Sequence, residues 1–234
     1  MSARRAGLAV LAVAALAACA GGKPAAADSS APAAVAATGI SVDTAGWVPL
    51  FDATLSRWRG WKSDSLVSRG WVITDSMISK DSVVSDLTTR TNYGNFELEF
   101  EWKVGAMGNA GVFYKVTDEY DKPYWSGPEY QLRDEAMDPE AKNLKLSSAS
   151  VYGLYAPPAG LTKPLGEWNT ARIVVKGDSV THWLNGQQAV AYALGSPDFT
   201  TLVKAAKFGE YPNFGRAAKG MIAIQGDHNG SLGL

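Results

Sequence analysis

The chain has 234 residues, of which 22 are basic and 23 acidic, and its formal charge is −1. No basic stripe runs along the sequence, so a nucleic-acid partner is not expected. A single cysteine excludes an internal disulfide, and two histidines are too few for a Cys/His zinc pattern.

The first 18 residues have the layout of a secretory signal. Arg4 and Arg5 precede an apolar stretch over residues 6–18 that is too short to span a bilayer. The stretch ends in Leu-Ala-Ala-Cys, which resembles the bacterial lipobox, where the cysteine is lipidated and becomes the mature N-terminus. We therefore expect lipidation of Cys19 and a membrane partner through this anchor. The expected location is the bacterial cell envelope, facing the periplasm or exposed at the surface.

Residues 19–45 are mostly Ala, Gly, Pro, Ser and Thr, a composition that cannot bury enough apolar surface to fold. This segment predicts a flexible tether between the anchor and one folded domain over residues 46–234. Without the two arginines of the leader, 20 basic residues face 23 acidic ones, so the mature chain is slightly acidic.

Strand patterns begin early in the domain. Residues 71–73 and 77–79 flank a short polar turn and predict a hairpin. Residues 95–104 alternate strictly between apolar and charged side chains, which is typical of an antiparallel strand with one wet face. A glycine-rich turn over 105–111 then predicts a return strand over 112–116.

A second hairpin is predicted over 172–176 and 180–184, around Gly177-Asp178. Asn185-Gly186 is a favoured pair for a type I′ turn and leads into a strand over 188–192. Helices are expected only over 137–144 and 199–206. Many short strands separated by turn signals predict an all-β, antiparallel sandwich or jelly roll.

The run Pro128–Asp134 carries the most chemistry. As a strand it places Tyr130 and Leu132 on one face and an acid, an amide and a guanidinium on the other: Glu129, Gln131 and Arg133. Such a row can bind a polyol or assist proton transfer, although a solvated strand face has the same pattern.

Both histidines are candidate site residues. His182 lies inside a predicted strand, where a structural histidine is the ordinary explanation. His228 follows Asp227 in a polar, glycine-containing loop after the apolar strand 221–224, and loops at strand ends concentrate functional side chains. The same residues also fit a simple turn.

Seven segments together resemble the 3-keto-disaccharide hydrolase domain family, in the family's order and over nearly the whole domain. Each segment alone is weak, but the ordered series is specific. The segments are residues 46–52, 92–98, 108–113, 128–132, 166–170, 182–186 and 224–228.

The resemblance implies a concanavalin-like β-sandwich from a secreted bacterial protein and a glycoside substrate with a ketone at C3 of its sugar. A C3 ketone acidifies the hydrogen on C2. A base can then form an enolate, the group on C1 leaves by β-elimination, and water completes net hydrolysis. Such a site needs a base, a group that stabilises the oxyanion, and polar groups that orient the hydroxyls.

The candidate catalytic residues are Glu129 or His228 as the base, together with Asp227. The oxyanion would be stabilised by Arg133, by Gln131 or by a divalent cation, for which Glu129, Asp227 and His228 are the tentative ligands. Asn109, Tyr114 and Tyr152 are candidate pocket residues. Core packing is the alternative for both tyrosines and is favoured for Tyr152.

Arg133 has a separate structural alternative, a cross-strand pair with Glu97 or Glu99. The family's pattern also continues the Asp-His loop with a final strand, whereas this sequence stops at Leu234. We therefore expect a C-terminally truncated sandwich that lacks most of its last strand.

The main alternative function is a non-catalytic carbohydrate-binding surface lipoprotein, since such folds host lectins as well as enzymes. A classical glycosidase with two carboxylates is less favoured, because Glu129 and Asp134 lie on opposite faces of a regular strand. The sequence contains no G-x-S-x-G nucleophile elbow and no phosphate-binding loop.

Overall fold

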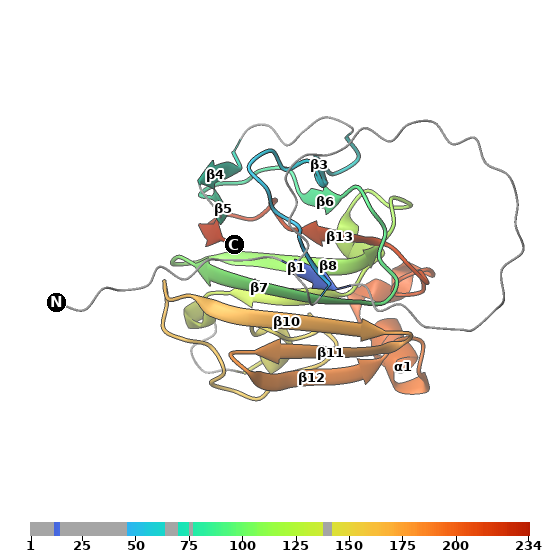
Figure 1. The fold of residues 1–234 in the computed structure, drawn as a ribbon. Coiled ribbons are helices and arrows are strands. Elements are labelled where there is room, and N and C mark those ends of the chain that lie inside the picture. The colour runs from blue at the N-terminus through green and yellow to red at the C-terminus, as the bar shows by residue number, and fades with distance from the viewer. Residues whose placement is uncertain (1–11, 15–45, 64–69, 75–76, 138–141) are drawn as a thin grey trace, which may run out of the picture.

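The computed structural model describes residues 12–14, 46–63, 70–74, 77–137 and 142–234. Its strands form two packed antiparallel sheets (Figure 1), which confirms the all-β sandwich. The larger sheet has the order β12-β11-β10-β7-β14-β5-β4, with β1 and β2 beside β7. Its strands are β1 (Ala12–Ala14), β2 (Trp47–Pro49), β4 (Val72–Thr74), β5 (Met77–Lys80), β7 (Phe96–Val104), β10 (Asn169–Lys176), β11 (Ser179–Leu184), β12 (Gln187–Ala193) and β14 (Leu232–Gly233).

The smaller sheet has the order β3-β6-β13-β8-β9 and carries the strands that matter for the site. Every neighbouring pair in it is antiparallel. Its strands are β3 (Trp58–Gly60), β6 (Leu87–Thr89), β8 (Asn109–Val116), β9 (Glu129–Arg133) and β13 (Met221–Ile224).

The hairpins follow the local turn chemistry. Strands β10 and β11 pair around Gly177-Asp178, and β4 pairs with β5, as the sequence predicts. Asn185 and Gly186 have φ values of 50° and 79° between β11 and β12. A type I′ turn requires positive φ at both central positions, which asparagine and glycine tolerate best.

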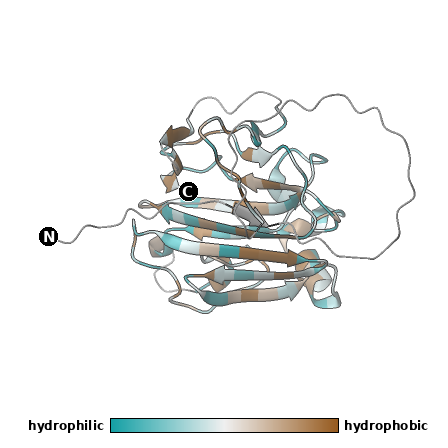
Figure 2. Ribbon diagram, viewed as in Figure 1, coloured by the Kyte–Doolittle hydropathy of each residue, from teal (hydrophilic) through white to brown (hydrophobic). Residues whose placement is uncertain are grey.

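The core lies between the two sheets, where apolar side chains of alternating positions meet. Figure 2 shows hydrophobic and hydrophilic residues distributed along the strands of both sheets. Phe100 of β7 packs edge-on against Tyr130 of β9, with ring centroids 5.7 Å apart. His182 is fully buried there and lies between the Tyr114 hydroxyl (2.9 Å from Nε2) and the Ala149 carbonyl (3.0 Å from Nδ1). Burial lowers the pKa of His182 to about 4, so this histidine is neutral and structural.

Two predicted boundaries were wrong. β8 begins at Asn109 instead of residue 112, because the turn is short: the Gly108 N–H bonds to the Gly105 carbonyl at 2.9 Å. The predicted helix over 137–144 is replaced at its ends by the 3₁₀ turns η2 (Glu135–Met137) and η3 (Leu144–Leu146), while residues 138–141 lie outside the described part.

The other predicted helix is present as α1 (Pro197–Ala205). The Ser196 side chain caps its N-terminus by accepting from the Phe199 N–H at 3.1 Å, and Pro197 fits the first turn. Two further 3₁₀ turns, η1 (Pro123–Trp125) and η4 (Lys207–Glu210), lie beside the smaller sheet and the end of α1.

The first and the last described strands both belong to the larger sheet. β1, from the predicted leader, pairs with β2 and with β7 at Glu97–Glu99, and β14 pairs with β5 and β7. Cys19 and the predicted tether lie outside the described residues, so the signal and the anchor stay predictions. The truncation of the last strand also stays a prediction; β14 itself spans only Leu232–Gly233. Among the described residues, no helix has the length and apolar character needed to cross a membrane.

Candidate active site

A polar row crosses the smaller sheet on the face that points away from the core. The Gly226 N–H donates to Asp86 Oδ1 at 2.7 Å, and the Gln225 N–H donates to the Gly111 carbonyl at 2.9 Å. Gly111 pairs in register with Gln131 of β9. The row consists of Asp86, Gln225, Gly111 and Gln131. Each lies next to a core residue in sequence, and because side chains alternate along a strand, each of these positions faces outward. Those core positions are Leu87, Ile224, Val112, Tyr130 and Leu132.

Glu129 lies on the same face, and its side chain extends over Gly111. A Cβ at position 111 would lie 2.6 Å from Glu129 Cγ, so only glycine leaves this space. Glu129 is only 7% exposed, so the predicted solvated face is instead covered. Burial raises the pKa of Glu129 to about 8, Lys207 opposes this shift, and the charges of Asp227 and Asp86 add to it. The carboxyl is therefore mostly protonated at neutral pH.

No described residue donates a hydrogen bond to the Glu129 carboxyl. A buried carboxyl without a fixed partner is costly unless it is neutral or meets a ligand. Perturbed carboxyls of this kind concentrate at functional sites. Glu129 is thus an acid that is free to transfer its proton to a bound molecule.

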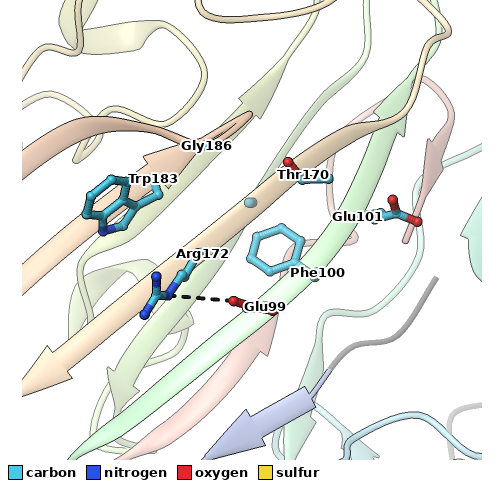
Figure 3. Close-up of a pocket in the computed structure, with 8 residues that line it drawn as sticks. Glu99, Phe100, Glu101, Thr170, Arg172, Trp183 and Gly186 are labelled. Atoms are coloured by element: carbon cyan, nitrogen blue, oxygen red, sulfur yellow. Dashed lines mark ion pairs between the residues drawn. The ribbon is translucent and has the colours of Figure 1, made fainter. Parts of the chain in front are cut away.

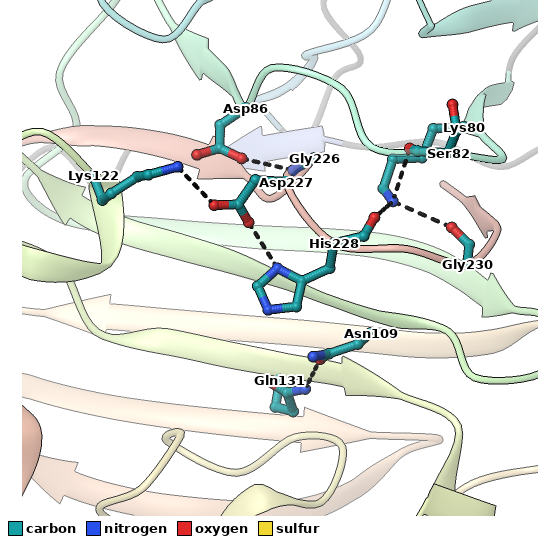
Figure 4. A network of polar contacts seen from close by, with 10 residues as sticks. All are labelled: Lys80, Ser82, Asp86, Asn109, Lys122, Gln131, Gly226, Asp227, His228 and Gly230. Carbon is teal, nitrogen blue, oxygen red and sulfur yellow. Dashed lines mark hydrogen bonds and ion pairs between the residues drawn. The ribbon is translucent and has the colours of Figure 1, made fainter.

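His228 is oriented by Asp227 in the loop after β13. His228 Nδ1 lies 2.7 Å from Asp227 Oδ1, and Lys122 Nζ lies 2.9 Å from Oδ2 (Figure 4). The hydrogen bond from His228 and then that from Lys122 hold the pKa of Asp227 well below its usual range. Asp227 is therefore an anion that fixes the imidazole, whose ring points toward Asn109 and Gln131 (Figure 4).

Asn109 of β8 and Gln131 of β9 form a hydrogen-bonded amide pair, toward which the His228 ring points (Figure 4). Gln131 Nε2 donates to Asn109 Oδ1 at 2.7 Å. This bond uses the Asn109 oxygen and leaves its amide nitrogen as a donor. The structure thus brings Glu129, Gln131, Asn109, Asp227 and His228 to one face.

Arg133 makes its hydrogen bonds outside this group. Its guanidinium donates to the Leu146 carbonyl at 3.2 Å and to the Asp134 carbonyl at 3.4 Å. The alternative of a cross-strand pair with Glu97 or Glu99 was wrong, because both glutamates pair with Arg172 of β10. Arg172 is the direct neighbour of Glu99 in the β10–β7 register, whereas Arg133 is on the other sheet.

The two predicted pocket tyrosines take different positions. Tyr114 is fully buried between the sheets, and its hydroxyl lies 2.6 Å from that of Tyr192, so the prediction that it lines the pocket was wrong. β8 places Tyr114 on the core face because Gly111 and Phe113 take the outer one. Tyr152 is partly buried and packs against the core, as expected, and its N–H donates to the Glu129 carbonyl at 3.2 Å, so it also borders the site.

The tentative metal ligands do not fit a metal ion. Both carboxylate oxygens of Asp227 are occupied, one by His228 and the other by Lys122. Over the residues that the structure describes, no group of three His, Cys, Asp or Glu side chains has the spacing to hold a metal. In this structure Asp227 pairs with His228 and Lys122, while Glu129 stands apart as a protonated carboxyl.

Sequence reasoning missed three charged residues of the site: Asp86, Lys122 and Lys207. Lys207 Nζ lies 4.7 Å from the Tyr152 ring centroid and 5.5 Å from that of Tyr124. Lys122 and Tyr124 share a short segment at η1, and a lysine beside an aromatic residue there was the only available signal. Asp86 and Lys207 stand in unremarkable surface-type segments, so only the fold brings them here.

A separate cavity of about 520 Å³ lies on the outer face of the larger sheet (Figure 3). There Arg172 lies 3.6 Å from Glu99 and stacks over Trp183 at 5.9 Å. Glu99, Arg172 and Trp183 are register neighbours on three adjacent strands, and a cross-strand ladder explains their contacts. None of the predicted site residues lines this cavity.

Known proteins are similar to this chain in sequence and in fold. The 3-keto-disaccharide hydrolase of Bacteroides thetaiotaomicron is 36% identical over 194 residues, which cover 73% of this chain and 67% of that protein. A crystal structure from Parabacteroides distasonis, provisionally described as a glycosyl hydrolase, is 30% identical, with a TM-score of 0.69 over 76% of this chain and 85% of its own. A second such structure from the same organism is 25% identical, with a TM-score of 0.58 over 76% of this chain and 95% of its own.

Residues 46–232 match the family described as the 3-keto-alpha-glucoside-1,2-lyase-like domain, which therefore covers almost all of the described sandwich. The likeness expected from the seven sequence segments is confirmed: this chain belongs to the 3-keto-alpha-glucoside-1,2-lyase-like domain family.

Proposed function

We propose that this chain hydrolyses glycosides whose sugar carries a ketone at C3, by removal of the C2 proton, β-elimination and hydration. One observation carries the proposal: a buried, protonated carboxyl, Glu129, shares a face with an imidazole, His228, that an ionised Asp227 holds. A protonated carboxyl and an imidazole on one face suit a reaction that needs both an acid and a base. Family membership and the relative's name support the substrate class.

The proposed steps use these groups in turn. The unprotonated nitrogen of His228 removes the C2 proton, and the electrons of the C–H bond form an enolate with the C3 ketone. The enolate reforms the ketone and a C1=C2 double bond while the C1–O bond breaks. Glu129 gives its proton to the departing oxygen, which keeps the bonding electron pair.

Hydration reverses these transfers. The Glu129 carboxylate takes a proton from a water molecule as that water adds to C1, and the protonated His228 returns a proton to C2. Net hydrolysis leaves both residues as they began. Asp227 stabilises the imidazolium that exists between the two halves of the reaction.

The enolate oxygen needs a cation or donor nearby. In place of Arg133, we assign this role to Lys207, with the free Asn109 amide as a second donor. The Lys207 ammonium lies over the rings of Tyr152 and Tyr124 and acts on the Glu129 carboxyl. Lys207→Met is expected to slow release about 100-fold, while Lys204→Met, an exposed lysine of α1, is the matched control.

The test compares a 3-keto-glycoside with its unoxidised parent. The wild-type chain is expected to release the aglycone only from the keto substrate, and Glu129→Gln is expected to slow that release by about 10²–10⁴-fold. Binding of both sugars without release of either aglycone would favour the carbohydrate-binding alternative. A chelator titration in the same assay tests the metal hypothesis independently.

For location, we propose a lipid anchor on Cys19 in the cell envelope. Metabolic labelling with a fatty acid is expected to mark the wild-type chain and to leave Cys19→Ser unlabelled. Labelling of both chains would contradict the anchor.

A further inference from the structure

A buried lysine lies behind the loop that carries His228. Lys80 ends β5 and is only 1% exposed. Its ammonium donates to the carbonyl oxygens of His228 at 2.7 Å, Gly230 at 3.2 Å and Ser82 at 3.4 Å (Figure 4). One cation therefore gathers three backbone carbonyls, two of them from the loop between β13 and β14.

The Lys80 ammonium is surrounded by protein groups in the way that a bound metal cation is. Burial lowers the pKa of Lys80, and the charges of Asp227, Asp86 and Asp81 oppose that shift. All the hydrogen bonds that its ammonium makes to described residues end on carbonyl oxygens, which take the place of water. Converging carbonyls around a positive charge are also how proteins hold simple cations. Lys80 thus supplies a cation that is covalently part of the chain.

His228 is consequently held at two points. Asp227 fixes the ring through Nδ1, and Lys80 fixes the carbonyl of the same residue. The next part of the loop is equally tight, because a Cβ at Gly230 would lie 2.7 Å from the Gly108 Cα. Since the ring moves with its backbone, the carbonyl contact limits where the imidazole can lie.

We propose that Lys80 is a positioning residue for His228: its ammonium acts as a built-in cation that sets the backbone of the loop and thereby the place of the imidazole. The inference rests on the proposed function, because it assumes that His228 transfers the proton. Lys80 itself does not touch the substrate.

The matched control is Lys115, which among the described residues is the other buried lysine that donates to a backbone carbonyl. Lys115 is 3% exposed, and its ammonium donates to the Ala218 carbonyl at 3.0 Å. Burial lowers its pKa too. Lys115 has no contact with the His228 loop, so it reports the general cost of losing a buried ammonium in this fold.

The experiment measures kcat and KM for Lys80→Met and Lys115→Met in the full chain on a 3-keto-glycoside. Lys80→Met is expected to lower kcat by about 100-fold with KM changed little, because a small misplacement of a reacting group has an effect of this size. Lys115→Met is expected to keep the wild-type kcat. In Lys80→Ala, n-propylammonium is expected to restore activity in a saturable way, while n-propanol and the corresponding Lys115→Ala mixture show no gain.

A second readout separates this inference from the proposed function. The ¹⁵N and ¹H signals of the His228 imidazole are expected to shift in Lys80→Met and to stay in place in Lys115→Met, whether or not the wild type cleaves the keto substrate. An inactive wild type with shifted His228 signals would defeat the proposed function and keep the positioning role. Unchanged His228 signals in Lys80→Met would overturn the positioning role of Lys80. Equal losses of kcat in Lys80→Met and Lys115→Met would overturn it as well.

Discussion

The side chain of Glu129 lies over the backbone of Gly111, its diagonal neighbour on β8. Glu129 pairs in register with Phe113, and its carboxyl leans back to the position where Gly111 has no Cβ. The glycine thereby makes room for a buried acid in the middle of a polar row. The position above Gly111 lies near both β9 and the loop of Asp227 and His228. The Gln225 N–H, just before that loop, donates to the Gly111 carbonyl, and the charge of Asp227 acts on the Glu129 carboxyl.

The first prediction concerns that space. Gly111→Ala is expected to displace the Glu129 side chain and to lower kcat/KM at least about 10-fold, because the new methyl group would overlap Glu129 Cγ. Gly60→Ala in β3 is the control, since a Cβ there meets only Ser63 Cβ at an ordinary 3.5 Å. Equal activity of the two variants would show that the place of the Glu129 carboxyl does not matter.

The second prediction concerns the pH dependence of stability. The pKa of Glu129 is about 8 in the folded chain against its usual 4.5, so folding favours the protonated form. Its contribution to the free energy of unfolding is therefore fully present below about pH 4.5 and is lost as the pH rises through 8. Glu129→Gln cannot ionise and avoids this loss.

We expect the stability of Glu129→Gln relative to wild type to rise between about pH 5 and pH 9. The gain approaches about 1.4 kcal/mol for each unit by which folding raises the pKa. Urea unfolding across this range measures the difference, and titratable groups that do not act on Glu129 contribute equally in both chains and cancel. A difference that does not change with pH would contradict a protonated, buried Glu129.

The third prediction concerns the acid behind the imidazole. Asp227→Asn keeps the shape but loses the charge that fixes His228 and stabilises its protonated form, so kcat is expected to fall about 10²–10⁴-fold. Lys122→Met removes only the outer partner of Asp227 and is expected to have a smaller effect. Steady-state kinetics on the keto substrate check this order, and a larger loss for Lys122→Met would reverse the assigned roles.

The fourth prediction separates core from site. Tyr114→Phe removes a hydroxyl that lies between His182 and Tyr192. We expect about 1 kcal/mol lower stability, because a buried hydrogen bond contributes about that much, and no change in kcat. Thermal unfolding and activity are measured on the same samples. A loss of activity without a loss of stability would show that the Tyr114 hydroxyl acts in the site and contradict its role in the core.

Local patterns predicted most of the fold. The alternation over β7 and the Asn185-Gly186 turn each specify their structure through neighbours in sequence, so the strand and the hairpin were predictable. The start of β8 was not, because Asn109 joins the sheet only through its partner Arg133 on β9. Pairing between strands decides such ends, and a single sequence does not state it.

The site was predictable to the extent that one element or one loop carries it. Glu129 and Gln131 follow from the period of a strand, and Asp227 with His228 from a polar loop at a strand end. Lys207 comes from a different part of the chain, and nothing in its own segment marks it. The polarity of a strand face also does not reveal its exposure. The burial that keeps Glu129 protonated therefore appears only in the folded structure, where Glu129 is 7% exposed.

The most direct test of the central claim uses a 3-keto-glycoside that carries deuterium at C2. The proposed mechanism breaks the C2–H bond, so the wild-type chain should release the aglycone more slowly from this substrate than from the protiated one. His228 carries the deuteron between the two halves of the reaction, and its exchange with solvent there should leave the sugar product depleted of deuterium. Release at an equal rate, with all the deuterium still on C2, would contradict proton abstraction at this site.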